Sequence, residues 1–418
     1  MAKNDDQLID HLFRTEYGKL VATLTRLFGT AYIQLAEDVV QDALITALNK
    51  WSVEGIPENP SAWLIQVAKR KALNELKRNQ MILTHHISIS SSQKSFEKID
   101  NVFLQNEIED SQLRMIFTCC HPSLNTESQI ALTLKTLCGF GVQEVANALL
   151  TSKSNINKRL YRAKTTIRNS NLPFSIPSGD ELKTRLQTVS TTLYLLFNEG
   201  YNVSSGNSII QKEFCLEAIR LTILLIKRFD EAPQLKALLA LMCFHISRFE
   251  ARIDDKGSII IFEEQDRSLW NKELIFKGMQ YLQMSINENV LSAYHIEASI
   301  AAQHCMAESF EKTDWQSIYN NYQLLEKIKP NPIIQLNLAI IKSKLDGLEA
   351  SLILLKKLEA NDVLKNYHLL PATQGIFNLK QGNFQKAKTY LEKSLLLNPS
   401  FKEVEFIKSK IAECEKSI

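Results

Sequence analysis

Apolar residues recur at steps of three and four along almost the whole chain, which is the spacing of one face of an α-helix. Glycine and proline, which interrupt helices, occur only 13 and 10 times in 418 residues. No stretch alternates apolar and polar residues for long enough to predict a strand. The sequence therefore predicts an all-α protein.

Breaks in this pattern divide the chain into four predicted parts. Residues 1–78 form a run of amphipathic helices that ends in a basic stretch. Residues 79–108 are rich in serine and poor in large apolar side chains, as is typical of a flexible linker. A compact helical block follows over residues 109–171, and residues 172–418 form an all-helical C-terminal extension.

One predicted helix, from Leu35 to Trp51, has two distinct faces. Its core side is apolar and consists of Ala36, Val39, Val40, Ala43, Leu44, Ala47, Leu48 and Trp51. The other face carries Asp38, Gln41, Asp42 and Ile45. An acidic face that contains an isoleucine suits docking on a basic partner, but a solvated face with one stray apolar residue explains it too. The segment alone leaves both interpretations open.

A second helix is predicted after Pro60, with Ser61 as its cap. Its core side consists of Leu64, Ile65, Ala68, Ala72, Leu73 and Leu76. The opposite face combines an aromatic ring, amides and cations, namely Trp63, Gln66, Arg70, Asn74 and Lys77, with Arg78 beside it. Cations neutralise phosphates, amides read base edges and a ring supports an unstacked base, so this face suits partly single-stranded DNA. An ordinary basic solvent face is the alternative.

Residues 142–161 have the pattern of a helix-turn-helix motif. Its apolar contacts are Val145, Ala146 and Leu149 from the first helix and Ile156 and Leu160 from the second, which Ser152 caps. From Lys153 to Arg168 the chain holds six cations and no acid. This charge favours a DNA-recognition helix. Two packed helices of a bundle with a basic polar face are the alternative interpretation.

Composition adds little about partners, since the net charge is only +3. Asp5, Asp6 and Asp10 stand where a signal peptide would be apolar, and no long apolar run is present, so we expect a cytoplasmic protein without a membrane segment. The seven cysteines lack paired spacing, which predicts reduced, buried thiols. Cys119, Cys120 and His121 are adjacent without the usual gap between zinc ligands, so we predict no metal site and no cofactor.

Three segments, taken in order, resemble regions of an extracytoplasmic-function sigma factor of the sigma-70 family. "AEDVVQDALITALNKW" and "NPSAWLIQVAKRKALNELKR" resemble region 2, and "LTLKTLCGFGVQEVANALLTSKSNINKRLYRAKTTIR" resembles region 4, with the polar linker between them. "DSQLRMIFTCCHPSLN", "TTLYLLFNEGYNVSSG" and "EEQDRSLW" are similar to the subgroup whose C-terminal extension contains tetratricopeptide-like repeats. Residues 315–400 carry the matching repeat pattern, most clearly around Gly375, Gly382 and Pro399.

The resemblance implies a protein that binds core RNA polymerase, through the β′ clamp helices and the β flap, and directs initiation at specific promoters. It implies no catalysis by this chain, and a regulatory extension with a protein partner. The polymerase-docking residues would be Asp38, Gln41, Asp42 and Ile45. The residues that contact the minus-10 element would be Trp63, Gln66, Arg70, Asn74, Lys77 and Arg78. The residues that contact the minus-35 element would be Ser152, Lys153, Asn155, Asn157, Lys158, Arg159 and Arg162.

Two other classes of function remain open from the sequence. One is a one-component DNA-binding regulator with a ligand- or protein-sensing helical domain. It would bind a palindromic site as a dimer through residues 142–161, and the face that carries Asp38 would have no partner. A hydrolase or transferase with a DNA-binding part would need converging polar groups between residues 180 and 320. The sequence shows no such set.

Overall fold

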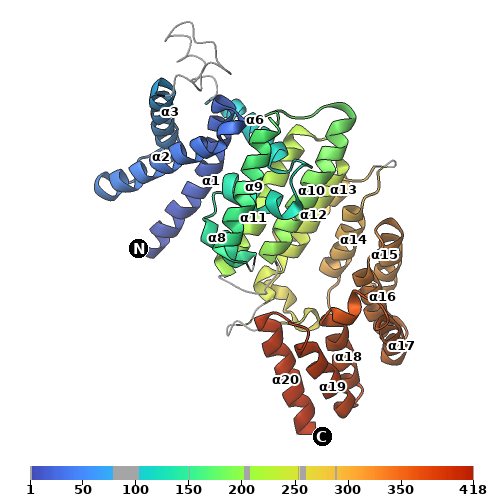
Figure 1. Ribbon diagram of the computed structural model, residues 1–418. Helices are drawn as coiled ribbons and strands as arrows, with labels where there is room; N and C mark the ends of the chain where they lie inside the picture. The colour runs from blue at the N-terminus through green and yellow to red at the C-terminus, as the bar shows by residue number, and fades with distance from the viewer. Residues whose placement is uncertain are drawn as a thin grey trace. The chain divides into compact units, whose positions relative to one another are not determined.

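The computed structural model describes residues 2–78, 103–149, 151–201, 208–252, 254, 260–287 and 290–417. Within these ranges the chain consists of α-helices and short 3-10 helices with no strand (Figure 1), which confirms the predicted all-α fold. It forms two compact units, Met1–Glu199 and Gly200–Ile418. Each helix in the described ranges is too short or too polar to span a lipid bilayer.

Three helices make the N-terminal bundle. They are α1 (Ala2–Phe28), α2 (Ile33–Glu54) and α3 (Pro60–Arg78), with the 3-10 turn η1 (Thr30–Tyr32) between the first two. Their apolar faces meet in a core that includes the fully buried Leu20, Val40 and Leu64. The ring of Trp51 joins the helices, because it packs against Phe13 of α1 and Trp63 of α3 with centroid distances of 5.4 Å each.

Two predictions about this bundle are wrong. Leu48 is 51% exposed rather than buried, because it follows Ile45 by three residues and shares its outward face. Ser61 does not cap α3, since the helix begins one residue earlier, at Pro60. The Asn59 side chain accepts the capping hydrogen bond from the amide of Ala62 at 3.0 Å.

The helix-turn-helix block contains α6 (Gln105–Cys119), α7 (Thr126–Thr136), α8 (Val142–Ala148) and α9 (Lys153–Asn169). Of the predicted apolar contacts, Val145, Ala146, Ile156 and Leu160 are buried and Leu149 is half-buried, which confirms the motif. The predicted linker, 79–108, falls mostly outside the described residues. Its last four residues are helical, since α6 begins at Gln105.

A long helix, α10 (Gly179–Tyr201), follows the helix-turn-helix block and is anchored on it. Arg185 donates a hydrogen bond of 2.6 Å to the carbonyl oxygen of Phe117 in α6, and its guanidinium lies over the Phe117 ring. Thr192 donates to the side chain of Gln129 in α7 at 3.0 Å. The first helix of the predicted extension therefore packs, up to Glu199, within the same compact unit as the helix-turn-helix block.

The second unit begins with a helical core and ends in a row of helices. The core contains α11 (Ser208–Arg228), α12 (Pro233–Ser247), α13 (Lys272–Met284), α14 (Ala293–Met306) and the turns η2 (Phe249–Ala251), η3 (Phe262–Glu264) and η4 (Arg267–Leu269). Arginines stabilise the turns, because the guanidiniums of Arg248 and Arg267 both lie over the rings of Phe262 and Trp270. Arg267 also caps α14, donating to the carbonyl oxygens of His304 and Ala307 at 2.7 Å each.

Successive helices pack in pairs toward the C-terminus. They are α15 (Trp315–Ile328), α16 (Pro332–Leu345), α17 (Leu348–Leu358), the turn η5 (Leu364–Asn366), α18 (Leu369–Lys380), α19 (Phe384–Leu395) and α20 (Phe401–Ser417). Each shares buried apolar residues with its neighbours, such as Ile318 with Ile341 and Leu391 with Ile407. Gly375 permits a close crossing of α18 and α19, since a Cβ atom there would lie 2.6 Å from the Leu391 side chain.

Acid is expected to weaken the attachment of α20. Burial alone would raise the pKa of Glu403, but the His368 ring, 3.2 Å away, and the polar groups of Ser400 hold it at about 2, below its usual 4.5. A carboxyl with a lowered pKa stabilises the fold fully above its unfolded value and loses that effect as pH falls toward the folded value. Relative to wild type, Glu403→Gln should therefore be less stable to urea at pH 7, with a difference that shrinks below about pH 4.5. A difference that is constant with pH would contradict this reading.

Candidate functional site

The acidic face of α2 is open to solvent. Asp38, Gln41, Asp42 and Ile45 are all exposed, and Ile45 is 54% exposed. Gln34 orients Asp38 by donating a hydrogen bond of 2.9 Å to its carboxylate. The exposed Leu48 enlarges the apolar part of this surface, so carboxylates and aliphatic side chains lie together on one side of the helix. We call these five residues, Asp38, Gln41, Asp42, Ile45 and Leu48, the α2 face.

The polar side of α3 is also exposed. Gln66, Arg70, Asn74 and Lys77 share it, and we call it the α3 face. Trp63 lies at its base and is half-buried, because its ring packs edge-on against Trp51. The side chain of Arg78, the sixth predicted residue, lies outside the described side chains.

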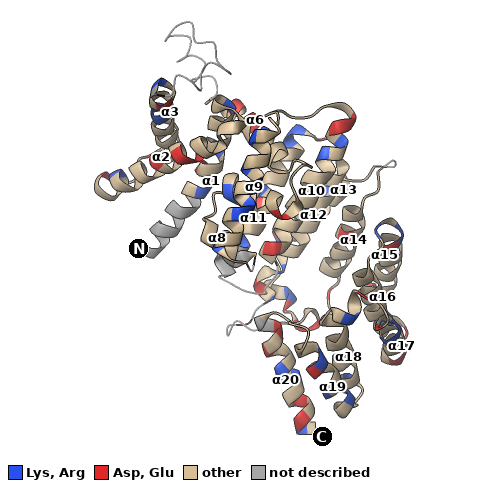
Figure 2. Cartoon of the chain, in the orientation of Figure 1, with Lys and Arg blue, Asp and Glu red and all other residues tan. Residues whose placement is uncertain are grey.

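Helix α9 carries lysines and arginines along its length, and their positions are coloured blue in Figure 2. Its start is fixed by Ser152, whose hydroxyl accepts a hydrogen bond from the Asn155 amide at 3.2 Å, as predicted. The first turns of α9 expose four of the predicted side chains, which we call the α9 face: Lys153, Asn155, Lys158 and Arg162. Arg159 instead forms an ion pair of 2.7 Å with Glu127 of α7. Asn157 is exposed as well, but it lines a hollow shared with α2, so we do not count it in the α9 face.

This hollow, of about 450 Å³, lies where α9 meets the N-terminal bundle. Beside it Glu37 is only 2% exposed. Its carboxylate accepts hydrogen bonds from Lys164 Nζ at 2.6 Å and from Thr136 Oγ1 at 3.1 Å. Lys164 also donates to Gln34 at 2.8 Å. Glu37 was not among the predicted site residues. Its spacing of four from Ile33 and three from Val40 places it on the core side of α2, where a carboxylate needs a partner, and this spacing could have indicated it.

The segments that carry these faces are similar to two known protein families. Residues 12–81 match Sigma-70 region 2, and residues 114–167 match Sigma-70, region 4. An uncharacterized protein of Rhizobium meliloti (strain 1021) is 32% identical over 381 residues, which cover 91% of this chain and 90% of that protein. The chain belongs to the sigma-70 family. It is an RNA polymerase sigma factor, and its region 2 and region 4 domains interact with core polymerase and promoter DNA.

The C-terminal part of the sigma factor has a separate match. Residues 185–286 match a family of unknown function (DUF6596). That match begins inside α10, at the arginine that is anchored on Phe117 of region 4. The extension of this sigma factor is therefore attached to region 4 by a packed helix.

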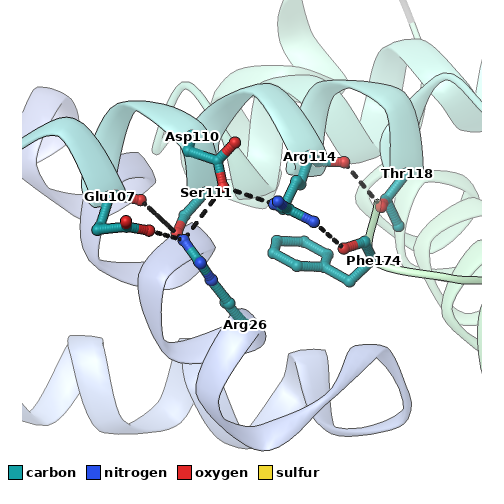
Figure 3. Close-up of polar contacts among 7 residues, drawn as sticks. All are labelled: Arg26, Glu107, Asp110, Ser111, Arg114, Thr118 and Phe174. Atoms are coloured by element: carbon teal, nitrogen blue, oxygen red, sulfur yellow. Dashed lines mark hydrogen bonds and ion pairs between the residues drawn. The ribbon is translucent and has the colours of Figure 1, made fainter. Parts of the chain in front are cut away.

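Region 2 of the sigma factor also contacts α6, the helix that leads into region 4, through ion pairs (Figure 3). Arg26 of α1 bonds to the carboxylates of Glu107 and Asp110, the latter at 3.1 Å. Asp110 also accepts a bond of 2.6 Å from Arg114, which in turn donates to the carbonyl oxygen of Phe174. This chain of contacts links α1, α6 and the segment that leads into α10.

The cysteines of region 4 are buried, as predicted. Cys119, Cys120 and Cys138 have no exposed surface, and burial raises the pKa of Cys120 to about 11. A thiol with so high a pKa is a poor nucleophile at neutral pH. His121 beside them bonds to the Ser123 hydroxyl at 2.7 Å.

Proposed function

We propose that this sigma factor is of the extracytoplasmic-function type and that the α2 face docks it on the β′ clamp helices of core polymerase. One observation carries the proposal: a single chain exposes an acidic and apolar face on α2 and, on α9, a basic helix without acids. The first suits a basic protein surface with apolar patches, and the second suits a DNA backbone. A regulator that acts without polymerase has no use for the first surface.

In this proposal the α3 face opens and reads the minus-10 element. Arg70 and Lys77 would neutralise phosphates, while the amides of Gln66 and Asn74 would read base edges. Trp63, half-buried at the base of this face, would support a base that has left the stack. Arg78 belongs to the same proposed set.

Helix α9 would lie in the major groove of the minus-35 element. Its first residues enter a groove most easily, as in other helix-turn-helix proteins, and these are Ser152, Lys153, Asn155, Lys158 and Arg162. Arg159 would have to exchange its partner Glu127 for DNA. Asn157, which is exposed and lines the hollow shared with α2, belongs to the same proposed set.

The extension would regulate the sigma factor through a protein partner. The paired helices from α15 to α20, the close crossing at Gly375 and the predicted repeats near 315–400 support a small tetratricopeptide-like solenoid. Such solenoids bind peptides or helices on extended surfaces.

Permanganate footprinting of a promoter tests the proposed role of α3, since it detects unpaired thymines. With core polymerase, wild type should open the minus-10 element, and Gln66→Ala/Asn74→Ala should reduce opening at least tenfold while binding polymerase normally. Ser52→Ala, an exposed change at the end of α2, is the control. Full opening by the double variant would remove α3 from this role.

A further inference from the structure

Two sequence motifs that the proposed function does not use meet in the second compact unit. "TTLYLLFNEGYNVSSG" contributes Tyr201, and "EEQDRSLW" contributes Arg267 and Trp270. Arg248, at the C-terminal end of α12, connects them. Its guanidinium donates a hydrogen bond of 2.9 Å to the Tyr201 hydroxyl and lies 5.6 Å from the centroid of the Trp270 ring. Segments that are distant in the sequence therefore form one cluster.

Aromatic rings hold three guanidiniums near one another in this cluster. Those of Arg248 and Arg267 lie 4.4 and 6.0 Å from the centroid of the same ring, Phe262. The guanidinium of Arg252 lies 3.7 Å from the centroid of the Tyr201 ring and donates a hydrogen bond to the Tyr201 carbonyl oxygen. Burial lowers the pKa of Arg252 and of Arg267, and the charge of Arg248 adds to the lowering in both. The three positive charges are thus close enough to repel one another.

Acidic side chains do not balance this charge. In the described ranges no carboxylate forms an ion pair with any of the three arginines. Nη1 of Arg248 and Nη2 of Arg267 are buried without a hydrogen-bond partner, and so is the indole N–H of Trp270, a residue that is only 4% exposed. The His304 ring beside them is neutral at pH 7, because burial and the charges of two arginines lower its pKa to about 3. Buried charges and buried donors are costly to leave unpaired.

An anion bound among these groups would offset both costs. With three cations and no paired acid, a dianion suits the cluster better than a single carboxylate. A phosphate monoester carries between about −1.5 and about −2 charges at pH 7, and its terminal oxygens accept the paired N–H groups of a guanidinium. Phe310 contacts Phe262 and also packs on Trp315, with a centroid distance of 5.0 Å, so apolar surface continues from the charged groups. That surface suits the organic part of a ligand.

We propose that this cluster binds the phosphate group of a small organic molecule, held by Arg248 and Arg267 with Arg252 beside them. The sigma factor would then carry a small-molecule site in its extension, apart from the faces proposed for polymerase and promoter. A DNA backbone fits the cluster less well, because these three arginines are half-buried, whereas the side chains of the α9 face are exposed.

Calorimetric titration of the full chain with phenyl phosphate, at constant ionic strength, tests the site. Wild type should bind one equivalent. Inorganic phosphate should bind about tenfold more weakly, since it lacks the apolar part that the rings would cover. Arg248→Gln and Arg267→Gln should each weaken the binding of phenyl phosphate by about tenfold or more, because each loses a charge-assisted hydrogen bond.

The matched control is another arginine that lies over an aromatic ring. Arg228→Gln removes an exposed guanidinium placed 5.7 Å from the centroid of Phe229, outside the cluster, and should bind phenyl phosphate like wild type. Circular dichroism shows whether each variant folds. If Arg267→Gln does not, Arg267→Lys keeps the charge but loses the planar fork, and it should still weaken binding.

Each contrary outcome overturns a stated part of the proposal. Equal binding by wild type and the folded cluster variants, or no binding of phenyl phosphate by wild type, would show that the cluster is not a phosphate site. An equal loss in Arg228→Gln would mean that net charge alone attracts the anion. If inorganic phosphate binds as tightly as phenyl phosphate, the organic ligand is wrong. Polymerase is absent from these titrations, so the proposed function stands or falls separately.

Discussion

Replacing Asp38 and Asp42 together with lysine is expected to weaken binding to core polymerase by more than about 100-fold, or about 2.7 kcal/mol. Both carboxylates are exposed on the α2 face, so the fold should tolerate the change. The loss has an electrostatic cause, because each lysine would meet a basic partner surface and like charges brought together cost several kcal/mol. Fluorescence anisotropy of the labelled sigma factor, titrated with core polymerase, measures it.

The matched control reverses the charge of two exposed carboxylates that lie far from α2 in the sequence. Glu349 and Glu405 are exposed in the extension, and Glu349→Lys/Glu405→Lys changes the net charge by the same amount. This control should bind polymerase like wild type. Equal losses in the two double variants would mean that net charge alone matters, and the α2 face would no longer be the docking surface.

Removing two cations from α9 is expected to abolish most of the affinity for minus-35 DNA. In Lys158→Gln/Arg162→Gln two exposed side chains of the α9 face lose their charge. For every phosphate that the protein no longer neutralises, the slope of log affinity against log salt falls by about one, so the slope should fall by about two. At about 0.1 M salt the affinity should fall by about 100-fold or more.

Titrations at several salt concentrations measure this slope with core polymerase present. Lys386→Gln/Lys408→Gln, which removes two exposed cations from the C-terminal helices, should leave it unchanged. A normal slope in the α9 variant would show that α9 does not lie against DNA phosphates.

Local features of this sigma factor could be predicted from its sequence. The cap at Ser152 and the burial of Ile156 and Leu160 follow from residue type and helical spacing, because each involves neighbours a few positions apart. The exposed faces of α2 and α3 follow in the same way. Helix-capping preferences gave the wrong residue where two capping residues lie two positions apart. Asn59, not Ser61, caps α3.

Contacts between distant segments could not be predicted in this way. Glu37 is separated from Lys164 by 127 positions, and no periodicity in either helix indicates that they pair. Position along α9 likewise does not show that this helix shares a hollow with α2, which Asn157 and Lys164 line. The hydrogen bond from Arg185 to Phe117 is another long-range contact. It joins the helix-turn-helix block to the C-terminal extension, which the sequence pattern predicted to be separate parts.

Reconstituted transcription tests the central claim most directly. The assay combines the purified protein with bacterial core polymerase and a library of promoter fragments. We expect specific initiation by the full chain, loss of initiation in the Asp38→Lys/Asp42→Lys variant, and retained initiation in the Glu349→Lys/Glu405→Lys control. Failure of the wild-type protein to bind core polymerase or to initiate at any promoter would contradict it.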